Sequence, residues 1–249
     1  MRLAALYDIH ANLPALEAAV AAVEQLGVEL IVIGGDVLPG PMPGETLEYL
    51  RSLTIPTAYL RGNGDREVLA VRDGATPLAV PARFHPMMRW VAEQLSDDQA
   101  HWIAQWPASV QLHLPELGDV LFCHATPRSD TELFTAASSD ALLQRIFALE
   151  TADVVVCGHT HMQFERDFAG LRIINAGSVG MAVGAGGAEW LLIDDRAALQ
   201  RTSYDRAQAA DRIRATRYPL AEEFAQSSVL VPSASATVLE AFTRAAEAP

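Results

Sequence analysis

Five short apolar segments, each followed within three residues by Asp, Asn or His, are the strongest constraint on the fold of this chain. Two of them, residues 3–7 and 30–33, are separated by residues 13–26, whose apolar side chains recur at helical spacing and which end at Gly27. A strand, a helix and a strand in this order predict a βαβ unit with a parallel strand pair and a right-handed crossover. The chain is therefore predicted to be an α/β protein.

The remaining sequence continues this alternation. Further strands are predicted at residues 57–60, 110–114, 120–123, 153–157, 171–174, 190–193 and 199–204. Helices are predicted at residues 45–53, 87–95, 97–106 (with Ser96 as N-cap) and 138–149. Residues 73–86, which contain three prolines, are predicted to form a loop. We expect one domain, residues 1–205, followed by a C-terminal helical segment, residues 206–249, packed on the same domain.

The charge of the chain limits the partners it can have. It carries 18 Lys and Arg against 31 Asp and Glu, a formal net charge of -13, which repels polyanions at long range, so non-specific nucleic-acid binding is not expected. No apolar run approaches the roughly 18 residues of a membrane span, and the first residues lack a signal-peptide pattern. We therefore expect a cytoplasmic protein without a membrane partner. Cys123 and Cys157 end apolar runs and are expected to be small buried side chains.

Ligand-type side chains follow the ends of five predicted strands. Asp8 and His10 are two residues apart, a spacing that places both on one side of an extended segment, and His159 and His161 repeat it. In an open α/β sheet the carboxyl ends of the strands line one crevice. The set comprises Asp8, His10, Asp36, Asn63, Asp65, His124, His159 and His161.

A metal centre is a better interpretation of this set than independent structural roles. A single Asp after a strand usually caps a turn or helix, and a single His usually lies on the surface or in the core, but five strand ends would have to acquire such residues independently. Oxygen and nitrogen ligands without thiolate suit Mn²⁺, Fe, Zn²⁺ or Ni²⁺ better than a structural zinc site. The ligands exceed what one ion takes, so two divalent ions are expected, with Mn²⁺ first among the candidates.

The chain resembles the calcineurin-like metallophosphoesterase superfamily in five ordered motifs: Asp8-Ile9-His10-Ala11-Asn12, Gly35-Asp36, Gly62-Asn63-Gly64-Asp65, His124 and Gly158-His159-Thr160-His161. The resemblance spans roughly residues 3–180 and is nearest to small bacterial phosphodiesterases and diadenosine-tetraphosphatase-like members. It implies a four-layer αββα sandwich of two mixed sheets. It also implies hydrolysis of a small phosphodiester or nucleoside polyphosphate through attack by a metal-bridging hydroxide.

The resemblance further implies a role for each residue of the set. The implied ligands are Asp8, His10 and His161 for the first metal, Asp36 as the bridging carboxylate, and Asn63, His124 and His159 for the second metal. Asp65 is expected to orient a ligand histidine rather than to bind metal.

Gly64 is a departure from the family pattern. Many members carry His at this position, where it is assigned to protonating or stabilising the leaving group. General acid catalysis contributes roughly 10²- to 10⁴-fold in rate, so we expect a preference for esters with good leaving groups, such as aryl phosphodiesters or nucleoside polyphosphates. His85 is the alternative acid that the sequence offers.

Three arginines flank the motifs, and a guanidinium group can bind phosphate bidentately. Arg128, four residues after His124, is the best candidate to hold phosphate, whereas Arg61 and Arg66 fit solvent-facing or ion-paired roles equally well. Residues 175–178 fit either an approach of backbone amides to the site or a plain hairpin turn. Trp90, Trp102 and Trp106 are expected in the core.

The phosphodiesterase hypothesis implies a small phosphorylated substrate as the partner. Two other functions are alternatives to it. The first is a phosphomonoesterase or protein phosphatase with an open groove. The second is a non-catalytic scaffold of the same fold that binds a protein, which the absence of the motif His at Gly64 favours and the completeness of the ligand set opposes. The sequence is compatible with a homo-oligomer.

Overall fold

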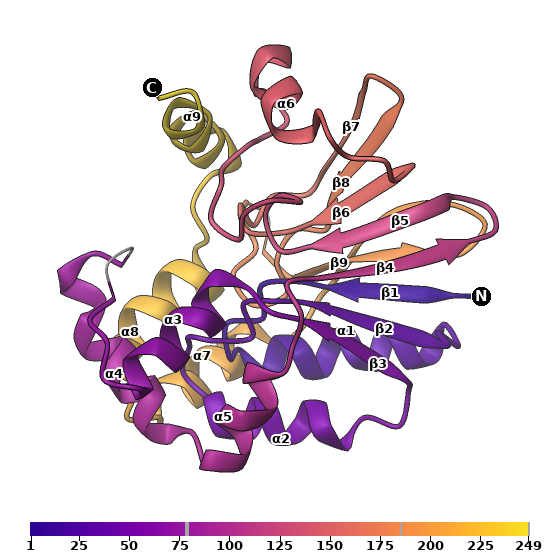
Figure 1. The fold of residues 1–249 in the computed structure, drawn as a ribbon. Helices are drawn as coiled ribbons and strands as arrows, with labels where there is room; N and C mark the ends of the chain where they lie inside the picture. Colours follow the sequence, from indigo (N-terminus) through magenta and orange to yellow (C-terminus); the bar gives the residue numbers. More distant parts are fainter. Residues whose placement is uncertain (78–79, 185, 249) are drawn as a thin grey trace.

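The computed structural model describes residues 1–77, 80–184 and 186–248 of the chain. In these residues two five-stranded sheets pack face to face, and helices cover both outer faces (Figure 1). The predicted four-layer αββα sandwich of mixed sheets is confirmed.

The first sheet, sheet A, contains the βαβ unit. Its strands, in order, are β10 (Ala197–Thr202), β9 (Ala188–Ile193), β1 (Leu3–Leu6), β2 (Leu30–Gly34) and β3 (Thr57–Leu60). β1 and β2 are parallel, as predicted, with a register that runs from Leu3 opposite Leu30 to Leu6 opposite Ile33. Because β3 continues this parallel arrangement, three neighbouring strands end at the same edge.

The second sheet, sheet B, combines two hairpins with a central strand. Its strands, in order, are β4 (Ser109–Leu114), β5 (Gly118–Cys123), β6 (Val154–Cys157), β8 (Leu171–Asn175) and β7 (Phe164–Phe168). β4 pairs antiparallel with β5, and β7 with β8, whereas β6 runs parallel to both of its neighbours. The carboxyl ends of β5 and β6 thus also share one edge.

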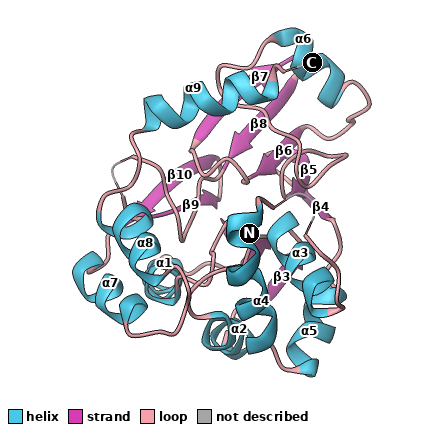
Figure 2. Cartoon of the chain, turned by 90° about the vertical axis from the view of Figure 1, so that its left-hand side faces the viewer, coloured by secondary structure: helices cyan, strands magenta, loops and turns pink. Residues whose placement is uncertain are grey.

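Most helices lie on the sheet A side (Figures 1 and 2). They are α1 (Leu13–Gln25), α2 (Pro43–Ser52), α3 (Asn63–Arg72), α4 (His85–Gln94), α5 (Asp97–Ala104), α7 (Arg206–Arg214) and α8 (Ala221–Phe224), with a 3₁₀ turn η1 (Ala82–Phe84) and a π-helical turn η2 (Ala225–Leu230). On the sheet B side lie α6 (Asp140–Phe147) and α9 (Ser235–Ala246). No helix among residues 1–77, 80–184 and 186–248 is long and apolar enough to cross a membrane.

The strand period of two divides the core into layers. Leu3 and Ala5 of β1 face sheet B, whereas Ala4 and Leu6 face the helices on the other side. The outer face of sheet B packs on α6 through a third apolar cluster, which includes Cys123 and Cys157. Both cysteines are buried and free, as expected. Every strand that carries a predicted ligand is therefore held on both faces.

Residues 206–230 pack on the sheet A side of the core. Ala209, Ala210, Ile213, Phe224 and Val229 are buried in the same cluster as α1 and α4. Pro219 and Pro232 lie outside the helices, as predicted. Residue 249 of the predicted C-terminal segment lies outside the described part of the chain.

The helix α3 was missed by the sequence analysis. Two glycines and an asparagine in its first turn hide it, but Asp65 at its third position accepts a hydrogen bond from the backbone N–H of Gly62, which is a helix-start signal. The predicted loop at residues 73–86 is also too long, since η1 and the start of α4 occupy its last five residues, and residues 78–79 of this loop are not among those described.

Candidate metal centre

The loops after β1 and β2 stay hydrogen-bonded beyond the sheet, and this brings their ligands together. The backbone N–H of Asp8 donates to the carbonyl of Gly35 at 3.1 Å, and that of His10 donates to the carbonyl of Asp36 at 2.9 Å. The β6 loop joins them, because the N–H of His159 donates to Oδ2 of Asp8 at 2.8 Å. Three loops that are distant in sequence therefore lie against one another at a single edge.

Five of the predicted ligands adopt the left-handed backbone conformation. The φ angles are 53° at Asp8, 47° at His10, 48° at Asp36, 67° at His159 and 57° at His161. A positive φ is uncommon in residues other than glycine, although Asp and His adopt it more readily than most. Residues in this conformation cluster at functional sites. The side chains of Asp8 and His10 do converge, but the assumption of an extended segment is wrong: left-handed backbone conformations place them.

The first group of ligands surrounds Oδ1 of Asp8. Nε2 of His161 lies 3.3 Å from this oxygen, and Nε2 of His10 lies 4.0 Å from it. The two Nε2 atoms are 3.1 Å apart. These three atoms lie within 4.8 Å of one another, as ligands of one ion would.

The second group surrounds Asp36 and His124. Nε2 of His124 lies 3.5 Å from Oδ1 of Asp36 and 3.1 Å from Oδ1 of Asn63. The other carboxylate oxygen of Asp36 is 3.8 Å from Nε2 of His10, so this side chain spans both groups. With its amide oxygen and nitrogen exchanged, Asn63 reaches Nδ1 of His159 at 3.0 Å. The structure thus brings together all seven predicted metal ligands.

An unpaired atom of the site indicates that these residues fit divalent cations. Oδ1 of Asp8 is fully buried and has no hydrogen-bond partner among the described residues. An unsatisfied buried carboxylate oxygen is costly, and a cation between it and the imidazole nitrogens removes that cost.

The electrostatics of these side chains point the same way. Burial raises the pKa of Asp36, and the nearby Asp8 carboxylate adds to the rise. Burial opposes ionisation of Asp8 as well, but the charges of His161 and His124 bring the pKa of Asp8 below its usual range. Burial lowers the pKa of His10 to about 3 and that of His159 to about 4, which keeps both imidazoles neutral, the form that binds metal. Two close carboxylates favour a cation between them.

Asp65 supports the loops rather than a histidine in this structure. Its carboxylate accepts hydrogen bonds from the backbone N–H groups of Leu38 at 2.9 Å and Gly62 at 3.0 Å. Nδ1 of His124 instead lies 3.0 Å from the carbonyl of Gly34, which orients the ring so that Nε2 points at the site. Burial and the Asp36 charge raise the pKa of Asp65 to about 7.

Gly64 has no space for a side chain. A Cβ atom at this position would lie 2.3 Å from the carbonyl oxygen of Leu38 and 3.0 Å from Oδ1 of Asp36. Its N–H donates to the same Asp36 oxygen at 2.7 Å. Gly64 therefore contributes to the site through its backbone N–H, which holds the carboxylate of Asp36. The alternative acid, His85, pairs through Nε2 with the carbonyl of Val80 at 2.8 Å.

The three arginines are engaged with protein groups. Nε of Arg128 donates to Glu132 at 2.9 Å, and its side chain is half exposed. Arg66 is paired with Asp130 and with Glu67, both at 2.7 Å. The structure therefore does not bring Arg128 to the seven ligands.

The third arginine, Arg61, also lies near a protein group, since its Nη1 is 3.4 Å from the carbonyl of Ala104.

The structure also places the turn at residues 175–178 and the three tryptophans. The turn at residues 175–178 supports the site indirectly, because the hydroxyl of Ser178 donates to the carbonyl of Asp8 at 2.7 Å. Trp106 is buried in the core, and Trp90 and Trp102 pack against it, as expected.

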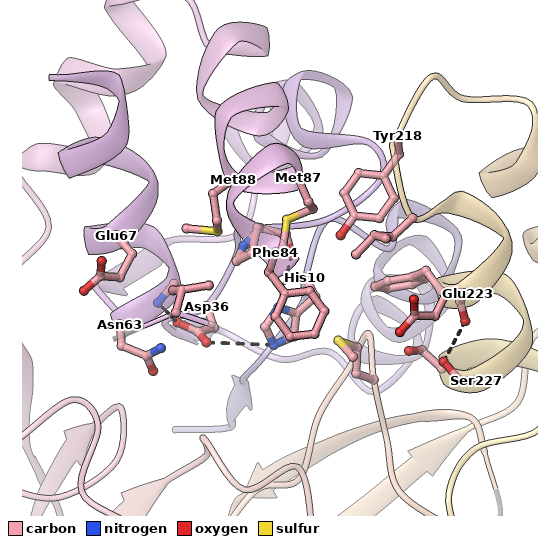
Figure 3. A pocket seen from close by; sticks show the side chains of 17 residues that line it. His10, Asp36, Asn63, Glu67, Phe84, Met87, Met88, Tyr218, Glu223 and Ser227 are labelled. Carbon is pink, nitrogen blue, oxygen red and sulfur yellow. Dashed lines mark hydrogen bonds and ion pairs between the residues drawn. The ribbon is translucent and has the colours of Figure 1, made fainter. Parts of the chain in front are cut away.

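A cavity of about 320 Å³ opens beside the metal ligands (Figure 3). His10, Asp36, Asn63 and Gly64 line one side of it. The other side comes from η1, α4 and residues 218–228. These residues carry no ligand-type motif, so only the tertiary packing reveals their position.

Comparisons with known proteins agree with this geometry. The sequence matches the model of the calcineurin-like phosphoesterase superfamily domain over residues 1–196. An uncharacterized protein of Methanocaldococcus jannaschii is 24% identical over 238 residues, which cover 87% of this chain and 93% of that protein.

Two solved structures share the fold. A hypothetical protein of Pyrococcus horikoshii OT3 superposes with a TM-score of 0.80 at 18% identity and covers 94% of this chain and 99% of that one. A metallophosphoesterase of Sphaerobacter thermophilus gives a TM-score of 0.69 at 23% identity, with coverage of 91% and 97%. With its ligand set and the family match over most of its length, the chain belongs to the calcineurin-like phosphoesterase superfamily and is a metal-dependent phosphoesterase.

Proposed function

We propose that the protein hydrolyses a small phosphodiester or nucleoside polyphosphate at a centre of two divalent cations, with Mn²⁺ as the first candidate. The observation that carries the proposal is the pair of overlapping ligand groups. Asp8, His10 and His161 form one group, and Asp8, Asp36 and His124 form the other. Asp36 reaches both groups through its two oxygens, which is the arrangement expected of a bridging carboxylate.

The metals and the protein supply different parts of the chemistry. When bound, two cations would neutralise phosphoryl oxygens and lower the pKa of a coordinated water towards about 7. The chain's own residues hold the ligands in fixed orientations: the Gly34 carbonyl aligns His124, and the Gly64 N–H holds Asp36. Asp65 stiffens the adjoining loop, since it ties Leu38 to the start of α3.

The lack of a side chain at Gly64 supports a preference for substrates with good leaving groups. No side-chain acid is available at that position, and the Leu38 carbonyl leaves no room for one. A leaving group that departs as a stable anion does not need protonation, so aryl phosphodiesters and polyphosphates suit the site better than simple alkyl esters.

A substrate panel tests the proposal. Bis(4-nitrophenyl) phosphate, 4-nitrophenyl phosphate and a dinucleoside polyphosphate are assayed with Mn²⁺, Ni²⁺, Fe²⁺ or Mg²⁺. We expect metal-dependent turnover of the diester or polyphosphate. Asp36→Asn should lower all activities together by more than about a hundredfold, because loss of an outer partner of a metal ligand alone costs 10- to 100-fold. Metal-independent turnover, or loss of only one activity, contradicts the proposal.

A further inference from the structure

The cavity beside the metal ligands has an apolar wall that lies partly outside the family match. Phe84 and Met87 come from η1 and α4, and Tyr218 and Phe224 come from the segment beyond residue 196. Figure 3 shows Phe84 and Met87 above His10 and Asp36, with Tyr218 and Glu223 approaching from the C-terminal segment.

This wall is held in place by the core. Tyr218 and Phe224 are each 6% exposed, and their rings meet edge to face with centroids 6.2 Å apart. Tyr218 also contacts Trp90 of α4 edge to face at 5.6 Å. The C-terminal segment and α4 therefore form one continuous surface, and the cavity exists before a ligand enters.

The charges around the cavity disfavour an anionic group away from the metal ligands. Glu67 and Glu223 line it, whereas no Arg or Lys is present among its described lining residues. Arg66 offsets the charge of Glu67 at 2.7 Å but does not itself line the cavity. A second phosphate against the apolar wall would lie near these carboxylates with no Arg or Lys among the described lining residues to bind it, whereas an uncharged ring would bury apolar surface there.

The size and position of the cavity identify what would enter it. His10, Asp36 and Asn63 line the same space, so a group esterified to a phosphorus at these ligands extends into it. Its volume of about 320 Å³ is near the lower end of ligand pockets, which span roughly 300–1,000 Å³. This volume suits one ring system. The methionines that line the cavity, Met87, Met88 and Met181, adapt to rings of different outline.

We propose that this cavity binds an uncharged apolar or aromatic group esterified to phosphorus, and that residues 218–228 form a wall that determines specificity. The proposal rests on the proposed function for the phosphoryl end of the substrate. It favours aryl and other apolar phosphodiesters over nucleoside polyphosphates as the substrate class.

Binding of two phosphonates tests this without turnover, because their carbon–phosphorus bond is not a phosphoester. Phenylphosphonate and methylphosphonate are titrated calorimetrically into the Mn²⁺-loaded protein. Burial of the ring predicts that phenylphosphonate binds at least about tenfold more tightly. Equal dissociation constants for the two compounds overturn the proposal.

A cavity-filling variant links this preference to the C-terminal wall. Ser228 is half-buried and lines the cavity, whereas Gln226 on the same turn is exposed and does not line it. Ser228→Trp should abolish the phenyl preference and raise the KM for bis(4-nitrophenyl) phosphate about tenfold, while methylphosphonate still binds. Gln226→Trp should leave both values unchanged, and thermal melting checks the fold of each variant. An unchanged phenyl preference in folded Ser228→Trp overturns the assignment of the wall.

The outcomes separate the two proposals. A phenyl preference in binding without hydrolysis of any phosphoester contradicts the proposed function and leaves the cavity assignment standing. Hydrolysis of diesters with equal binding of the two phosphonates supports the proposed function and contradicts the cavity assignment.

Discussion

The two sides of the substrate cavity are built in different ways. On one side the ligands lie in loops that directly follow buried strands, and backbone hydrogen bonds such as that from Asp8 to Gly35 fix the loops to each other. On the other side the apolar wall comes from α4 and residues 218–228, which are joined only by side-chain packing. The catalytic side therefore depends on backbone geometry, and the wall depends on tertiary contacts.

This difference teaches where chemistry and specificity reside in the molecule. The ligand side carries buried carboxylates, left-handed turns and the unsatisfied Oδ1 of Asp8, all of which cost folding free energy. The wall contributes buried apolar surface, which stabilises the fold. Changes on the ligand side should therefore act on catalysis first, and changes in the wall on stability and substrate choice.

The largest effect is expected at Asp8, which belongs to both ligand groups. Asp8→Asn removes the anionic oxygen that both groups share, so metal content should fall from two ions per chain and kcat/KM should drop by more than about a hundredfold. Elemental analysis and diester turnover measure the two quantities. Asp195→Asn makes the same chemical change at an exposed turn and should alter neither. Full metal content in Asp8→Asn would contradict the expectation that changes on the ligand side, unlike those in the apolar wall, act on catalysis first.

A smaller but still large effect concerns the leaving group. Because Gly64 supplies no acid, the rate should fall steeply as the pKa of the leaving phenol rises, by roughly a hundredfold between a 4-nitrophenolate and an unsubstituted phenolate ester. A series of substituted aryl diesters measures the slope. A rate independent of the leaving-group pKa would instead require an acid elsewhere in the cavity.

The ligand side carries signals that are local in the sequence. Its predicted ligands follow apolar runs within a few residues, so the five strand ends could be recognised without knowledge of how the sheets pair. The same local view misjudged the backbone at Asp8 and His10, since a left-handed turn is stabilised by hydrogen bonds to another loop. It also missed α3, whose first turn carries Gly and Asn for the sake of the site.

The wall could not be predicted in this way. Phe84, Met87 and Tyr218 carry no ligand-type motif in the sequence. Tyr218 is more than a hundred residues away from Phe84 and Met87 along the chain, although all three line the cavity. Whether the C-terminal helices cover the site or the outside of the sheet depends on tertiary packing, and no pattern within residues 206–249 specifies it.

A moderate effect on stability is expected at Gly64. In Gly64→Ala the new Cβ meets the Leu38 carbonyl at 2.3 Å, so the free energy of unfolding should fall by about 1–3 kcal/mol. Gly44 in α2 is the matched control, because a Cβ there meets nothing within 4 Å, and Gly44→Ala should stabilise by about 0.5–1 kcal/mol. Denaturant unfolding measures both. Equal stability of Gly64→Ala and the wild type would show that the loop after β2 yields, and that the ligand side is less rigid than its backbone contacts imply.

The smallest effect separates the two states open to Arg128. If this guanidinium binds substrate phosphate as the sequence predicts, it must leave Glu132, whose carboxylate holds it now. Arg128→Ala should then raise KM several-fold, and Glu132→Gln should lower it, because the competing ion pair is exposed to solvent and weak. The two substitutions shift KM in opposite directions only if Arg128 leaves Glu132 for the substrate phosphate. An unchanged KM in both variants assigns Arg128 to the surface ion pair alone, and phosphate recognition then depends on the ligand side without help from the flanking arginine.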